Sequence, residues 1–313
     1  MAISSVWGTM IPLFLVLLLG VAVRLAGILD WQTCRKLSSF IVNVAQPLLI
    51  VASFQTKTDS SSFRVAFFLV LIALIMNICY TFAAFLIYRD ENKANKATLE
   101  FGLIFGNITY LGYPLLLVPF PESGPFYFAI FALVSNIYAQ TVGKYLLNSG
   151  KKSSKSLAKS LINPGTIAAV IGILLRILPF DVPAVFTDTM MTVGNMCFPL
   201  AMLIVGSLIC NQPIKKLFSP KLYMFSLFKL IVLPLVTLAV FLIFANKGSE
   251  GMCYVVMIMA SVPTAASTAI YSDLYKGNSS LAASCVGISS LFSVVTVPVM
   301  LWFAKLMFEV IYK

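Results

Sequence analysis

The chain has 313 residues, 60% of them hydrophobic and 11% charged, and its mean hydropathy is +0.96. A soluble protein of this length would carry about a quarter charged residues, so the composition indicates an integral membrane protein. The sequence contains no histidine, which excludes histidine-based catalysis, histidine-ligated metals and histidine proton relays. Since it also shows no cysteine pair with metal-ligand spacing and no paired carboxylates, we expect neither an enzyme nor a cofactor.

Ten apolar stretches are each long enough to cross a bilayer as a helix, which takes about 20 residues. A polar stretch at 148–160 divides them five and five. An odd number of spans in each half turns the second half over in the membrane. The sequence therefore predicts an all-helical protein of two inverted five-helix repeats, 1–147 and 161–313, joined by the linker 148–160. The predicted spans are 6–26, 36–54, 64–88, 99–119, 126–147, 162–180, 188–210, 221–245, 251–275 and 280–304.

The second and seventh spans share an asparagine four residues before a proline, Asn43 with Pro47 and Asn195 with Pro199. Proline lacks the N–H that would bond the carbonyl of that asparagine, so each site combines a free acceptor with an amide. One interpretation is a proline kink capped by a neighbouring helix or by water. The other is a functional polar site, and the matching positions in the two halves favour it.

The fourth and ninth spans are interrupted by polar residues and proline, at 106–114 and 260–267. Unpaired backbone is tolerated inside a membrane only where protein or a wet cavity supplies partners. The second half of each broken helix would begin near the midplane, and two helix N-termini facing one point attract an anion. Two kinked packing helices are the alternative, since Gly102 and Gly106 also suit close contact. The predicted substrate contacts are Asn107, Thr109, Tyr110, Pro114, Ser261, Pro263, Thr264 and Ser267.

Three further polar residues lie within predicted spans. Asn136 and Gln140 are four residues apart in the fifth span and share one helix face, so we expect both amides to turn inward and assign them to the substrate site. Lys229 lies in the eighth span, where a cation marks a functional site by default. We expect its long stem to snorkel to the inner surface instead.

The loops predict the orientation. Most Lys and Arg residues fall in one set of alternate loops, including the linker 148–160. Because basic loops stay on the cytoplasmic side, we expect the linker to be cytoplasmic and both termini to lie outside, in a multi-pass protein of the cell membrane. The net charge of +11 follows from this topology, so we expect no nucleic-acid partner.

Across its whole length the chain resembles the auxin efflux carrier family, and in particular its shorter prokaryotic members such as malonate and malate permeases. That family falls within the superfamily of bile acid, arsenite and riboflavin transporters. The matching segments are QPLL at 46–49, NITYLGYPL at 107–115, NP at 163–164, FPLA at 198–201, VPTAA at 262–266 and SVVTVP at 293–298.

The resemblance implies that spans one, two, six and seven form a scaffold. The other spans would form a transport domain with an X-shaped crossover at Pro114 and Pro263. It also implies transport of organic anions: auxin in plants, and malonate, malate or related carboxylates in bacteria.

Where some relatives place an acid in the third span, this chain has Asn77, which leaves the coupling ion open between H+ and Na+. The related bile acid symporters use sodium, and this likeness implies a cation site at the freed carbonyls of Asn43 and Asn195, beside Pro47 and Pro199.

We therefore expect a secondary active transporter of small organic anions that works by alternating access, with the lipid bilayer around it and a second copy as partner in a homodimer. A sodium-coupled symporter of a larger organic anion, similar to the bile acid symporters, is the alternative. A channel would need a continuous polar or charged lining, and no span shows a charged stripe. A receptor would usually carry a soluble sensing or signalling domain, and the ten predicted spans and their short loops include none, so a receptor is disfavoured.

Overall fold

The computed structural model describes residues 3–55, 62–148, 162–178, 182–210, 219–275 and 277–312. Within these ranges every regular element is helical, and β-type pairing is limited to one isolated bridge between Gly106 and Thr264. The predicted all-helical class is thus confirmed for the described residues. The predicted linker 148–160 lies outside them apart from Asn148.

The elements follow the predicted spans in order along the chain. They are α1 (Ile3–Leu25), α2 (Trp31–Phe40), η1 (Ile41–Ala45), α3 (Gln46–Phe54), α4 (Ser62–Ile87), α5 (Lys93–Ile104), η2 (Ile108–Gly112), α6 (Tyr113–Leu117), α7 (Gly124–Tyr138), η3 (Ala139–Gly143), α8 (Lys144–Leu147), α10 (Pro164–Ile177), α11 (Ala184–Asn195), α12 (Cys197–Cys210), α14 (Pro220–Leu227), η4 (Phe228–Val232), α15 (Leu233–Phe244), η5 (Lys247–Ser249), α16 (Glu250–Ser261), α17 (Ser267–Leu274) and α18 (Ser279–Tyr312).

Seven helical stretches of the described chain are long and apolar enough to cross a membrane. The other three predicted spans are shorter as helices, each for a visible reason. The fourth is divided into α5 and η2–α6, the ninth is divided into α16 and α17, and α10 has 14 described residues. Two of the three short spans are therefore short because their helices are interrupted.

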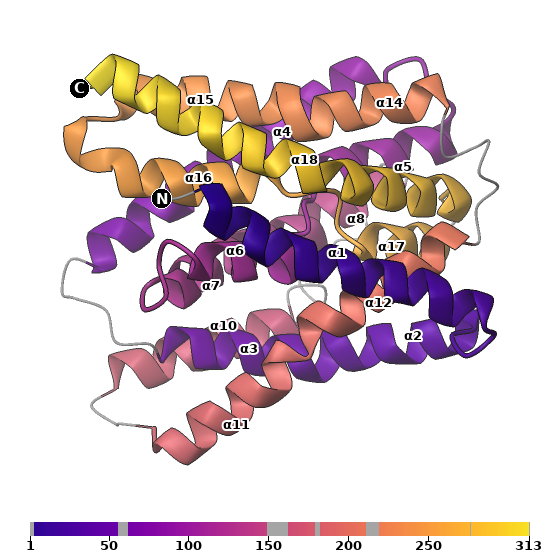
Figure 1. Ribbon diagram of the computed structural model, residues 1–313, viewed down its shortest axis with the longest axis horizontal. Coiled ribbons are helices and arrows are strands. Elements are labelled where there is room, and N and C mark those ends of the chain that lie inside the picture. Colours follow the sequence, from indigo (N-terminus) through magenta and orange to yellow (C-terminus); the bar gives the residue numbers. More distant parts are fainter. Residues whose placement is uncertain are drawn as a thin grey trace.

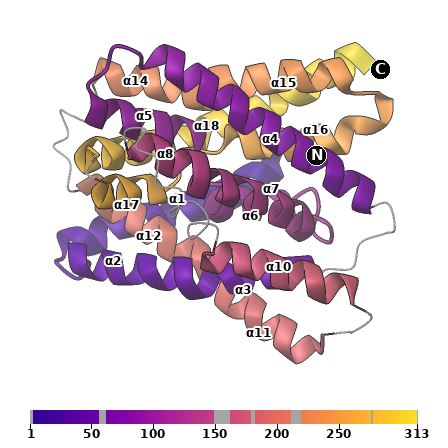
Figure 2. The ribbon, with the colours of Figure 1, turned by 180° about the vertical axis from the view of Figure 1, so that it is seen from behind.

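The helices lie in layers (Figures 1 and 2). One side carries α4, α5, α14, α15, α16 and α18, and the other side carries α2, α3, α10 and α11, with the short helices α6, α7, α8 and α17 between them. The start of α1 and the end of α18 lie at the same end of the molecule, opposite the turn between α1 and α2. The helices α6, α7, α8 and α17 thus lie between the two outer layers.

Of the four π-helical turns in the described residues, three end two residues before a proline: η1 before Pro47, η2 before Pro114 and η4 before Pro234. A proline ring clashes with the carbonyl four residues earlier and offers that carbonyl no N–H. A π turn is wider than an α turn and gives the ring room. The prolines within these spans are therefore accommodated without interrupting the helix.

Helices α1 and α12 pack backbone to backbone at two glycines. A Cβ on Gly206 would lie 2.1 Å from the carbonyl oxygen of Leu17, and one on Gly20 would lie 2.4 Å from that of Leu203. Small residues that let backbones touch are the common basis of helix association in membranes. This contact joins the first helix of the chain to the second half of the sequence.

We expect Gly206→Ala to destabilise the protein by about 1–3 kcal/mol, because the added methyl group must push the two backbones apart. Thermal unfolding in detergent measures the effect. Gly8→Ala is the matched control on α1, since nothing lies within 4 Å of a Cβ at Gly8. Equal melting temperatures for the two variants would contradict this packing.

Candidate functional site

Two helical segments are interrupted in the interior of the protein. α5 ends at Ile104 and its continuation η2 begins at Ile108, while α16 ends at Ser261 and α17 begins at Ser267. We call the residues between them, 105–107 and 262–266, the two breaks. Both overlap the interruptions that the sequence predicts at 106–114 and 260–267.

The first break is shorter than predicted. Residues 108–114 are helical, because η2 and α6 run through them, and Pro114 is the second residue of α6. The π turn before Pro114 gives the proline ring room, so the helix continues through this residue. Placing Pro114 in the break was therefore wrong, whereas Pro263 does lie within the second break.

The two breaks supply each other with backbone partners. The N–H of Asn107 donates to the carbonyl of Pro263 at 2.7 Å, and the N–H of Ala265 donates to the carbonyl of Phe105 at 3.0 Å. These bonds form the antiparallel bridge between Gly106 and Thr264. Unpaired backbone inside a membrane protein costs several kcal/mol per group, and this pairing removes much of that cost.

At the end of α5, side chains donate hydrogen bonds to backbone carbonyls that have no N–H partner within the helix. The hydroxyl of Thr264, which is fully buried, donates to the carbonyl of Gly102 at 3.1 Å. Nζ of Lys229 donates to the carbonyl of Leu103 at 2.9 Å. The carbonyl end of a helix carries partial negative charge, so a lysine is favourable there.

Lys229 does not snorkel to the surface, and that prediction was wrong. Its side chain is 1% exposed, and Nζ lies 5.5 Å from the centre of the Tyr80 ring. A Cβ on Gly106, in the first break, would be 3.5 Å from Nζ. Within the described chain Lys229 makes no ion pair with a carboxylate. The carbonyl end of α5 and the Tyr80 ring hold the stem inward, so this lysine belongs to the breaks.

The second halves of the broken helices begin differently. At η2, Asn107 is the N-cap, and its Oδ1 accepts from the N–H of Tyr110 at 3.2 Å. Asn107 is 2% exposed, and its Nδ2 is buried without a partner among the described residues. At α17 the N-cap is Ala266, whose side chain satisfies no N–H, and Oγ of Ser261 in α16 is likewise buried without a partner. Both places therefore keep polar capacity that the described protein does not use.

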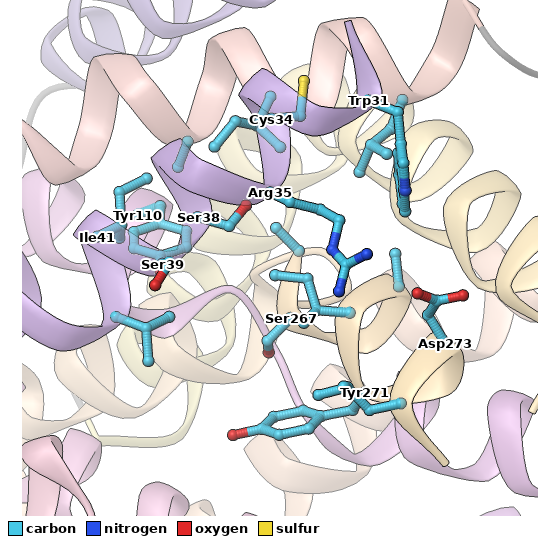
Figure 3. A pocket seen from close by; sticks show the side chains of 18 of the residues that line it. Trp31, Cys34, Arg35, Ser38, Ser39, Ile41, Tyr110, Ser267, Tyr271 and Asp273 are labelled. Atoms are coloured by element: carbon cyan, nitrogen blue, oxygen red, sulfur yellow. The ribbon is translucent and has the colours of Figure 1, made fainter. Parts of the chain in front are cut away.

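A cavity of about 350 Å³ reaches these two helix starts. Tyr110 of η2 and Ser267 of α17 lie in its wall, together with Asn43 of η1. Figure 3 shows the side chains of Tyr110 and Ser267 together with those of Ser38 and Ser39 from α2. The breaks thus face a space large enough for a small molecule. Apolar residues of α12 and α17 complete the wall: Ala201, Ile204, Leu208, Ala269 and Ile270.

The remaining predicted contacts are not part of the cavity wall. Thr109 accepts from Nε2 of Gln46 at 3.4 Å. Gln140 is buried, and its Nε2 donates to the hydroxyl of Tyr271, which lines the cavity. Asn136 donates to Oδ1 of Asn163, the N-cap of α10, so its amide is engaged in holding the start of that helix.

The two Asn–Pro elements occupy different surroundings. Asn43 lines the cavity, and its Nδ2 donates back to the carbonyl of Ser39 at 2.8 Å. Asn195 is the last residue of α11 and is exposed, outside the cavity wall. Pro47 follows η1, and Pro199 is the third residue of α12. A cation site shared by the two elements remains a prediction.

Sequence reasoning did not single out most of the cavity wall, including three of its polar residues. Arg35 on α2, and Tyr271 and Asp273 on α17, all line it. A signal was present, because Arg35 and Asp273 both lie inside a helical stretch next to polar residues rather than in a loop.

Comparisons with known proteins agree in class. A sequence model of the family described as membrane transport protein matches residues 5–301. The chain is 26% identical over 322 residues to an uncharacterized transporter of Methanocaldococcus jannaschii, covering 94% of this chain and 99% of that protein. It is 24% identical over 303 residues to an uncharacterized transporter of Methanothermobacter thermautotrophicus, covering 94% of this chain and 96% of that protein.

Proposed function

Because the chain belongs to the membrane transport protein family, as its likeness to the auxin efflux carriers predicted, we propose that it is a secondary active transporter of small organic anions. The substrate binds in the cavity at the two breaks and is carried by alternating access. This multi-pass membrane protein is thereby assigned a substrate class and a site.

One observation carries the proposal: the same cavity reaches the N-termini of both interrupted helices. Tyr110 in the first turn of η2 and Ser267 at the start of α17 both line it. A helix N-terminus presents free N–H groups and about half a positive charge. Two of them at one cavity favour a carboxylate over a neutral or cationic molecule.

The unused donors at the breaks support the same substrate class. Nδ2 of Asn107 is buried and unpaired within the described residues. Nζ of Lys229 has three N–H donors, and the described structure supplies one hydrogen-bond acceptor, the Leu103 carbonyl. An anion accepts hydrogen bonds without donating any, so it matches this surplus of donors.

We propose ten membrane crossings in two inverted halves, 1–147 and 161–313, with the paired breaks as an X-shaped crossover. The common end at which α1 begins and α18 ends fits an even number of crossings. With both termini outside, the cavity opens toward the cytoplasm, because its exposed residues Trp31 and Arg35 lie at the opposite end. The homodimer, and H+ or Na+ as coupling ion, belong to this proposal.

Uptake into proteoliposomes tests the proposal with a panel of labelled mono- and dicarboxylates. Each compound is measured with and without an imposed proton or sodium gradient. We expect saturable uptake of at least one carboxylate, accelerated by one of the two gradients, and no uptake of matched amines. Uptake of amines, or of no carboxylate under any gradient, would contradict the proposed function.

A further inference from the structure

The cavity wall contains one positive and one negative side chain, Arg35 and Asp273. Arg35 is on α2 and Asp273 is in the last turn of α17. Figure 3 shows the guanidinium and the carboxylate turned toward one another across the cavity. In the described part of the chain, neither takes part in an ion pair or a hydrogen bond, and both are exposed. Both groups are therefore free to bind a molecule in the cavity.

Asp273 lies six residues after Ser267 along α17, which is about 9 Å at the rise of an α-helix. Trp31, in the first turn of α2, lies beside Arg35 in the wall and is 39% exposed. Tyr110 and Ser267 mark the inner part, where the two helix N-termini lie. A substrate whose carboxylate is at the inner part therefore presents its far end to Arg35 and Asp273.

The pair has a specific chemical preference. Arginine donates hydrogen bonds and accepts none, whereas an ionised aspartate accepts and does not donate. Together they match a neutral group with both an acceptor and a donor, such as a carboxamide. A second carboxylate would gain from Arg35 but be repelled by Asp273, because like charges in close approach disfavour binding.

We propose that Arg35 and Asp273 select the far end of the substrate, so that the transporter takes monocarboxylates with a neutral polar end and discriminates against dicarboxylates. This inference rests on the proposed function, since it assumes an inner carboxylate. Arg35 supplies the donor and Asp273 supplies both the acceptor and the repulsion. Both act as specificity-determining residues.

Dicarboxylates and their half-amides test Arg35 and Asp273 directly. A dicarboxylate and its half-amide have nearly the same size and differ by one charge. Succinate with succinamate, glutarate with glutaramate and adipate with adipamate cover three lengths. Uptake of each compound is measured in proteoliposomes of the full chain. We expect the wild type to prefer the half-amide at the best length by about tenfold, the effect of one hydrogen bond to a charged group together with the lost repulsion.

Three variants separate the roles. Asp273→Asn removes the repulsion, so we expect the ratio of dicarboxylate to half-amide uptake to rise by about tenfold or more. Arg35→Gln should lower the uptake of both the dicarboxylate and its half-amide. Lys36→Gln removes the same charge from the neighbouring position of α2, outside the cavity wall, and should leave the ratio unchanged. Melting temperatures close to wild type establish that the exposed substitutions preserve the fold.

Each outcome bears on one statement. Equal wild-type uptake of dicarboxylate and half-amide, or a ratio unchanged in Asp273→Asn, overturns the inference. So does a wild type that carries other carboxylates but no half-amide, or an equal change in ratio with Lys36→Gln. If the wild type carries no carboxylate at all, the proposed function itself fails.

Discussion

Asn107→Asp is expected to abolish carboxylate binding while leaving the protein folded. Aspartate caps a helix as well as asparagine does, so the bond to the N–H of Tyr110 is kept. The buried donor Nδ2 is replaced by a negatively charged acceptor. Two like charges about 4 Å apart repel by about 4 kcal/mol at an effective dielectric constant of ~20, which corresponds to about a thousandfold in affinity.

Calorimetric binding of the best carboxylate and thermal unfolding in detergent give the two measurements. Asn107→Ala is the companion variant, because it removes the cap as well as the donor. We expect it to lose about 0.5–2 kcal/mol of stability and to weaken binding as well. A binding constant unchanged in Asn107→Asp would show that this side chain acts only as a cap.

Lys229→Met is expected to stop transport and to destabilise the protein. The substitution leaves the buried carbonyl of Leu103 without its donor, at a cost of about 1–3 kcal/mol. It also removes a charge beside the breaks. A unit charge acts on another about 8 Å away with about 2 kcal/mol at an effective dielectric constant of ~20, or roughly thirtyfold in anion affinity.

Lys93→Met provides the control with the same change of side chain. Lys93 is the first residue of α5 and is exposed. Charges on an exposed surface contribute little to stability, so we expect near-normal stability and uptake. Equal impairment of both variants, or normal uptake with Lys229→Met, would contradict a role for Lys229 at the breaks.

Sequence alone predicted the features that depend on local chemistry. Apolar stretches located the helices, and the polar and proline-containing segments located the breaks. Asn107 was singled out as a substrate contact because it is a polar residue at an interruption within a span. The extent of the first break was misjudged, since a proline is compatible with either a break or a helix preceded by a π turn. Pro263 lies in a break, where its carbonyl accepts a hydrogen bond from the N–H of Asn107, whereas Pro114 lies in the helix α6.

Contacts between distant segments were harder to foresee. Whether Lys229 reaches the surface or the interior depends on the rotation of its helix and on what lies beside it, and the carbonyl end of α5 is far away in sequence. Arg35 and Asp273 likewise come together only when α2 and α17 flank the same cavity. Charge and hydropathy place each residue in a span, but they do not say which residues meet.

The π turn in the second span changes the phase of that helix. Each π turn inserts one residue, so the side chains after it are rotated by roughly 100° relative to those before it. Before η1, the stripe with Arg35, Ser38 and Ser39 faces the cavity, whereas after η1 residues 49–54 are all buried. The inserted residue thereby joins a half that lines the cavity to a half that is buried on all sides within one span. Deleting one residue of η1 would rotate these two halves relative to one another by roughly 100° and turn Arg35, Ser38 and Ser39 away from the cavity.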